Sequence, residues 1–134
     1  SNLARTLKSL QDQGLVKIDD NIDQLKASTK DIKENPKNLK FKEIEAAGLP
    51  RAVESADLAG VPGNFALAAG MKLDDAVFLE NMPDQFRNVV AVREADENSQ
   101  LAKDLKAVVE SDEFEKVIDS QFKGFGKPDW MKNK

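Results

Sequence analysis

The chain has 134 residues, of which 40% are hydrophobic and 33% charged, and its net charge is −4. This is the size of one ordinary globular domain. The acidic balance argues against nucleic acid as a partner, because phosphate-binding surfaces are basic. The sequence has no histidine and no cysteine. It therefore lacks the side chains of zinc sites, iron–sulfur clusters, thiol catalysis and serine–histidine–aspartate triads, and we expect no catalytic residue, metal site or cofactor.

Leucines at helical spacing predict a first helix, which Ser1 or Asn2 can cap and Gly14 can end. Its apolar stripe is Leu3, Leu7 and Leu10. Residues 15–18 form an apolar, extended link, and residues 31–34 are compatible with a short helix. Proline restricts the residue before it, so the pair at 35–36 interrupts that helix.

Short apolar segments bounded by turn residues predict strands in the middle of the chain. These segments are 40–45, 58–61, 77–79 and 88–92. The last is a continuous apolar run, which is typical of a central strand covered on both faces. Between them, Asn64 is expected to cap a helix over residues 65–69, which Gly70 closes.

Two amphipathic helices are predicted near the C-terminus with no strand between them. The first begins after Asn98 or Ser99, and Ser111 caps the second. Their apolar stripes are Leu101, Leu105, Val108 and Val109 in one, and Phe114, Val117, Ile118 and Phe122 in the other. Because helix and strand alternate over most of the length, the predicted class is α/β.

Arg5 is a candidate anion-binding residue. It lies about 200° around the first helix from Leu3, so it points away from the apolar stripe. It also sits in the first turn, where open backbone N–H groups favour an anion. A bidentate guanidinium in that place suits an α-carboxylate, although a solvated arginine is the more common outcome.

Short motifs follow one another along the whole chain. They are SNLARTL (1–7), GLVKI (14–18), DIKENPKNLK (31–40), EIEAAGLPR (43–51), DLA (57–59), GNFA (63–66), FLE (78–80), NVVAVRE (88–94) and Trp130. In order and spacing the chain resembles the NlpA/MetQ-type lipoproteins, the substrate-binding components of methionine ABC importers. The matching family patterns include TN-x-x-R-x-L, ENPK-x-LK, ELEAAQLPR and DLAVINGNYA.

The resemblance implies an α/β chain that is the second lobe of a type II periplasmic-binding-protein fold plus the C-terminal return strand and helices. Residues 1–76 would form the second ligand-binding lobe, and residues 77–134 would pack on a first lobe. A full-length member is about twice as long, and the chain begins without Met, so we expect a truncated piece. The signal peptide and the lipid anchor would belong to the absent N-terminus, which places the parent protein outside the cytoplasm on the cell membrane.

The ligand residues implied by the resemblance are Asn2, Arg5 and Asn64, with Arg5 on the ligand carboxylate. Two departures concern the same pocket, because Pro62 replaces the first asparagine of NGNYA and Gly48 replaces the glutamine of AAQLPR. Each unmade hydrogen bond costs about 1–3 kcal/mol. The resemblance therefore indicates the family and leaves the ligand open among methionine, another amino acid, a modified methionine and a short peptide.

The implied partners are an amino-acid ligand (methionine or an analogue) and an ABC permease. The alternative is a non-transporting surface or interaction lipoprotein whose pocket is vestigial or altered. An enzyme using its acidic pairs is the weakest hypothesis, since no base–nucleophile constellation exists without histidine or cysteine. The C-terminal apolar stripes need a cover, so a homodimer or a swapped assembly of the fragment is also expected.

Overall fold

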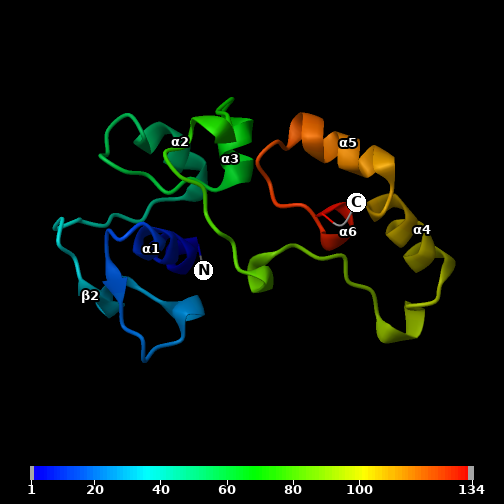
Figure 1. Cartoon of the computed structure of the whole chain (residues 1–134), viewed down its shortest axis with the longest axis horizontal. Helices are drawn as coiled ribbons and strands as arrows, with labels where there is room; N and C mark the ends of the chain where they lie inside the picture. Colours follow the sequence, from blue (N-terminus) through cyan, green and yellow to red (C-terminus); the bar gives the residue numbers. More distant parts are fainter. Residues whose placement is uncertain (1, 133–134) are drawn as a thin grey trace. The chain divides into compact units, whose positions relative to one another are not determined.

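The computed structural model describes residues 2–132, and the chain divides into two units, Ser1–Phe86 and Arg87–Lys134. Figure 1 traces the chain from the first unit, in blue to green, into the second, in yellow to red. Each unit has its own secondary structure and is described here by itself.

Helix α1 (Asn2–Asp12) is the centre of the first unit. Its inward face packs on the two-stranded antiparallel ribbon of β1 (Lys17–Ile18) and β2 (Ile32–Glu34), in which Ile18 pairs with Ile32. The buried cluster of this unit is Ala4, Leu7, Ile18 and Ala27, with Leu3, Ile22, Ile32 and Phe41 packed against it. The expected stripe of the first helix is therefore the face that forms the core.

The ends of α1 agree with the sequence pattern where the structure describes them. The chain leaves the helix through Gly14, whose φ of +74° lies in the left-handed region that glycine adopts without strain. Asn2 is the first helical residue. The cap predicted at Ser1 lies outside the described residues.

The helix expected over residues 31–34 is wrong, because Asp31 ends a 3₁₀ turn, Thr29–Asp31, and the three residues after it form β2. The Asp31 carboxylate accepts a hydrogen bond from the Ser28 N–H at 2.8 Å, which closes this turn. The Asp31 carbonyl accepts from the Asp19 N–H at 2.8 Å, next to the β1–β2 pairing. A four-residue helix would give up these bonds and the place of Ile32 against the core.

Two short helices follow in the first unit, α2 (Leu49–Ala52) and α3 (Gly63–Ala68). Asn64 does not cap α3. Pro62 occupies the N-cap position with an extended backbone (φ −60°, ψ 137°), and no side chain caps the helix. The helix thus begins two residues earlier than expected, and Asn64 lies inside its first turn. Gly70 follows the helix with φ +78°, as predicted.

The strands expected at 40–45, 58–61, 77–79 and 88–92 do not form. Within residues 2–132, the pairing of β1 with β2 is the only strand pairing, and these four segments have no regular secondary structure over most of their length. A strand needs a neighbour to satisfy its backbone groups, and here the apolar side chains also lack cover. Val77 is 92% exposed and Val89 is 82% exposed, so the buried central strand predicted at 88–92 is wrong for this structure.

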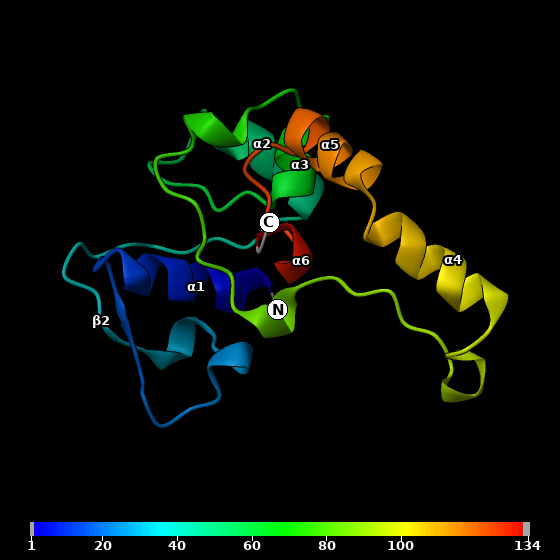
Figure 2. The same cartoon turned by 45° about the vertical axis from the view of Figure 1, so that its right-hand side comes forward.

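The second unit consists of α4 (Gln100–Val109), α5 (Asp112–Gln121) and the short α6 (Asp129–Lys132). Figure 2 shows α4 and α5 as two successive rods joined by a tight turn. The cap predicted at Ser111 is confirmed, and of the alternatives Asn98 and Ser99 the structure has Ser99 as the cap. The Ser99 and Ser111 hydroxyls accept from the Ala102 and Phe114 N–H groups, each at 3.2 Å. No helix among residues 2–132 has the length and apolar character needed to cross a bilayer.

Candidate functional site

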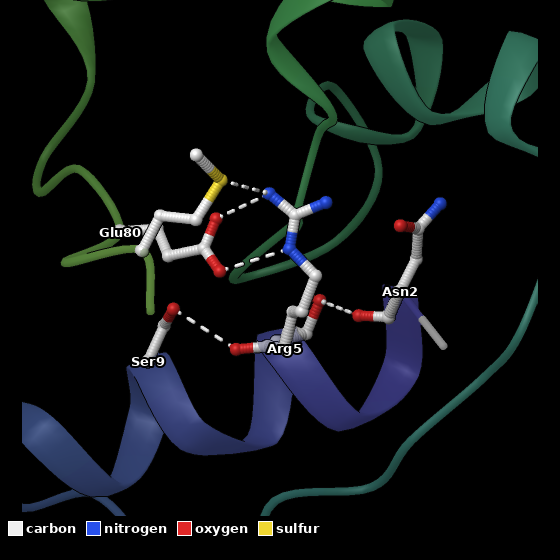
Figure 3. Close-up of polar contacts among 6 residues, drawn as sticks. Asn2, Arg5, Ser9 and Glu80 are labelled. Atoms are coloured by element: carbon white, nitrogen blue, oxygen red, sulfur yellow. Dashed lines mark hydrogen bonds and ion pairs between the residues drawn. The ribbon is translucent and has the colours of Figure 1, made fainter. Parts of the chain in front are cut away.

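The most specific polar contact of the first unit joins α1 to the segment that follows α3. Arg5 makes a bidentate ion pair with the Glu80 carboxylate, with Nε–Oε1 at 2.9 Å and Nη2–Oε2 at 2.6 Å (Figure 3). Both side chains are partly shielded, at 30% and 24% exposure. Arg5 therefore holds a carboxylate by two parallel hydrogen bonds, which is the strongest geometry available to a guanidinium.

Two further residues hold the Arg5 guanidinium. The Met82 sulfur accepts from Nη2 at 3.3 Å, and the Phe86 ring lies with its centroid 5.3 Å from the guanidinium carbon. The latter distance is within range of a cation–π interaction. Glu80 raises the pKa of Arg5 above its ordinary value, by its hydrogen bonds first and its charge second, while partial burial acts in the opposite direction.

Asn2 lies one turn before Arg5 on the same side of α1. In Figure 3 both side chains rise from that side of the helix. The Asn2 carbonyl accepts from the Thr6 hydroxyl at 2.9 Å, and the Arg5 carbonyl accepts from the Ser9 hydroxyl at 3.0 Å. The Asn2 side chain is exposed, and within the described part of the chain its amide makes no hydrogen bond. The amide is therefore available to a ligand beside Arg5.

The segment before α3 also approaches α1. A Cβ built on Gly60 would stand 2.9 Å from Thr6 Cγ2, so only glycine fits at this position without moving Thr6. This contact places the start of the 60–64 turn next to the residue that follows Arg5. Asn64 itself is exposed and, among the residues described, has no hydrogen bond to Asn2 or Arg5. The structure thus brings Asn2 and Arg5 together, and it shows no direct contact of either with Asn64.

Sequence reasoning identified Arg5 but missed its partners Glu80, Met82 and Phe86. Glu80 belongs to the FLE motif, which carried no role of its own. The pair is separated by 75 residues, so no local spacing could reveal it. Residues 2–132 contain no group of three or more acidic side chains placed to hold a metal ion. The candidate site therefore consists of the Arg5 guanidinium, which already binds the Glu80 carboxylate, and the neighbouring Asn2 amide.

Comparison with known proteins places the whole chain in one group. The sequence model described as NlpA lipoprotein matches residues 1–130. The probable D-methionine-binding lipoprotein MetQ of Vibrio cholerae is 33% identical over 131 residues, which are 97% of this chain and 48% of that protein. Outer membrane lipoprotein 1 of Mannheimia haemolytica is 40% identical over 95 residues, which cover 70% of this chain and 34% of that protein. The chain spans about half the length of the curated relatives it matches.

A solved structure is also similar over nearly the whole chain. It is that of a nutrient binding protein from Burkholderia cenocepacia bound to methionine, with a TM-score of 0.79 and 37% identity over 91% of this chain and 52% of that one. This likeness confirms the predicted fold class, an α/β chain with the fold of part of a periplasmic binding protein. It does so even though the present structure pairs only β1 with β2 among its described residues.

Proposed function

This chain belongs to the NlpA lipoprotein family, and we propose that it is the ligand-binding second half of a substrate-binding lipoprotein that serves an ABC importer for methionine or a related amino acid. The observation that carries this proposal is the similarity, over 91% of the chain, to a protein that was solved with methionine bound. The role is binding and delivery, with no chemical step. The partners are the amino acid and an ABC permease, and the location is extracytoplasmic, anchored by lipid.

In this proposal the polar end of the ligand lies against the exposed side of α1. The Arg5 guanidinium binds the α-carboxylate, and the neighbouring Asn2 amide adds a hydrogen bond. Asn64, in the first turn of α3, supplies the third contact. Residues 1–76 form the second lobe, and residues 77–134 pack on the first lobe.

The ligand identity depends on the turn before α3. Pro62 caps α3 by its backbone conformation alone, and proline offers neither an N–H nor an amide side chain. Gly48 likewise offers no side chain where the family pattern has glutamine. Both changes remove polar partners from the region of a zwitterionic ligand, so we expect weak binding of methionine or a preference for a different amino acid.

The same two positions support a second candidate, a surface lipoprotein that no longer transports. One similar relative is named only as an outer membrane lipoprotein. The two candidates differ in whether the pocket works. A Pro62→Asn variant separates them, since it returns the amide side chain without touching Arg5.

Calorimetry on the intact protein that contains this chain tests the proposal. The wild type is titrated with methionine and a panel of amino acids, beside Arg5→Ala and the exposed-arginine control Arg51→Ala. Loss of a charge-assisted hydrogen-bond pair is worth about 1.5–3 kcal/mol, so we expect Arg5→Ala to weaken binding by roughly 10- to 100-fold. Arg51→Ala should bind as the wild type does.

Two results would decide against the importer role. If neither the wild type nor Pro62→Asn binds any amino acid, the vestigial pocket is favoured. If Arg5→Ala binds as tightly as the wild type, the ligand contacts are elsewhere. Binding that appears only in Pro62→Asn would show that this residue changed the specificity.

The second unit carries a separate part of the proposal. The apolar stripes of α4 and α5 are partly exposed, with Leu101, Val108, Val117 and Phe122 facing solvent. We propose that a first lobe covers them in the intact protein, and that a second copy covers them when residues 1–134 are produced alone. Light scattering of residues 1–134 checks this, and a monodisperse monomer would contradict it.

A further inference from the structure

We propose that Glu80 is a positioning residue, which fixes the Arg5 guanidinium so that its Nη1 amino group receives the carboxylate of the ligand. This inference rests on the proposed binding function and adds a residue that acts through Arg5. Glu80 lies 75 positions along the chain from Arg5, in the segment that leads out of the first unit.

The hydrogen-bond partners of Arg5 show which of its N–H donors are free. A guanidinium carries five N–H donors in a rigid plane. Glu80 takes one from Nε and one from Nη2, and the Met82 sulfur contacts Nη2 as well. Among residues 2–132, Nη1 has no hydrogen-bond partner. In the view of Figure 3, Nη1 is on the side of the guanidinium where Asn2 lies.

Three residues of one short segment contact the Arg5 guanidinium. Glu80 holds the side edge, Met82 contacts Nη2, and Phe86 lies against the face at 5.3 Å. An arginine side chain that is free to rotate loses considerable rotamer entropy when it binds a ligand. Because this segment already fixes Arg5, the side chain loses this rotamer entropy when the protein folds and not when the ligand binds.

The opposite role for Glu80 is competition, in which its carboxylate occupies the place of the ligand carboxylate. The geometry favours positioning, because Glu80 uses the Nε and Nη2 donors, Met82 contacts Nη2 as well, and the Nη1 donors have no partner among residues 2–132. A carboxylate at Nη1 does not need to displace it. The two roles predict opposite signs for the loss of Glu80, so one experiment distinguishes them.

The test uses calorimetry on the intact protein with two probes, methionine and methioninamide, which has no carboxylate. We expect Glu80→Ala to weaken methionine binding on the order of tenfold and to leave methioninamide binding unchanged. Glu80→Gln keeps one acceptor oxygen, so it should rescue part of the loss. Glu54→Gln removes the same charge from an exposed residue and should have no effect.

A double-mutant cycle gives the second readout. If Glu80 acts through Arg5, adding Glu80→Ala to Arg5→Ala should cause no further loss of methionine affinity. Tighter methionine binding in Glu80→Ala would overturn the inference in favour of competition. Equal losses for both probes would also overturn it, since they would indicate only a structural role.

The failure of the proposed function looks different. A wild-type protein that binds neither methionine nor any other amino acid of the panel contradicts both the function and the inference. A wild type that binds methionine while Glu80→Ala binds it equally well leaves the function standing and rejects the role of Glu80 alone.

Discussion

Helix α1 has Ala4, Leu7 and Leu10 buried, whereas no residue of α4 or α5, all of them within the described part of the chain, is buried. All three helices carry an apolar stripe at helical spacing. The difference is that α1 has β1, β2 and the loop around Ala27 to pack against, and α4 and α5 contact mainly each other. The same sequence pattern thus gives a core in one unit and an exposed face in the other.

An apolar stripe at helical spacing therefore predicts that a helix forms, but it does not predict which surface covers the stripe. In the first unit the stripe and its cover lie within about 40 residues of each other. In the second unit, the helices rest on local interactions, namely the Ser99 and Ser111 caps and the Asp119–Lys127 ion pair. We expect mutations to separate the two units clearly, packing changes acting on the first and capping changes on the second.

The largest expected effect is that of Leu7→Ala, since Leu7 is 0% exposed at the centre of the core. Removing a buried leucine side chain costs about 2–5 kcal/mol of unfolding free energy. Leu101→Ala makes the same chemical change at a leucine that is 66% exposed, where less than about 1 kcal/mol is expected. Urea unfolding of residues 1–134, followed by circular dichroism at protein concentrations low enough to keep the chain monomeric, measures both.

Equal losses in the monomer would break the comparison, because they would show that Leu101 is buried within a single copy. At higher protein concentration, the proposed covering of α4 by a second copy should increase the loss in Leu101→Ala. The measurement should therefore be repeated at several protein concentrations, since a covered interface makes the unfolding midpoint concentration-dependent.

The sequence predicted best what is decided locally. The stop at Gly14, the caps at Ser99 and Ser111 and the stripe of α1 all depend on residues within one or two turns. The four expected strands failed because a strand depends on a neighbour elsewhere in the chain. Val89 and its neighbours have the composition of a central strand, but no described segment pairs with them.

The candidate site around Arg5 likewise has features that the sequence predicts and features that it does not. The orientation of Arg5, away from the core, follows from helix geometry and was predictable. Its pairing with Glu80 depends on how the chain returns after α3, which no periodicity encodes. Asn64 shows the intermediate case, in which the turn was recognised but Pro62 took the cap position.

A smaller effect, confined to the second unit, is expected from Ser111→Ala. The Ser111 hydroxyl accepts from the Phe114 N–H at the start of α5, and loss of such a cap costs about 1 kcal/mol. Ser120→Ala is the matched control, because that hydroxyl donates to the Lys116 and Val117 carbonyls within the helix and caps no helix end. Hydrogen exchange of the α5 amides should quicken in the first variant and stay unchanged in the second. Faster exchange in α1 as well would contradict independent units.

The smallest effect is electrostatic and belongs to the loop between β1 and β2. The Asn21 N–H donates to the Asp19 carboxylate at 2.9 Å, and Lys33 Nζ lies 3.3 Å from Asp19 Oδ1. These contacts, the backbone hydrogen bond first, lower the pKa of Asp19 below its ordinary value. The ionised form therefore stabilises the folded state fully above the ordinary pKa of about 4, and this stabilisation is lost as the pH falls through the lower folded value.

Asp19→Asn should consequently lower the unfolding free energy slightly at pH 7, and its difference from the wild type should shrink at about pH 2. Lys33→Gln should remove less of this pH dependence, because the backbone donor of Asn21 is the larger cause. Urea unfolding at the two pH values measures both variants. A difference between Asp19→Asn and the wild type that persists unchanged in acid would show that Asp19 acts by shape and hydrogen bonding rather than by charge.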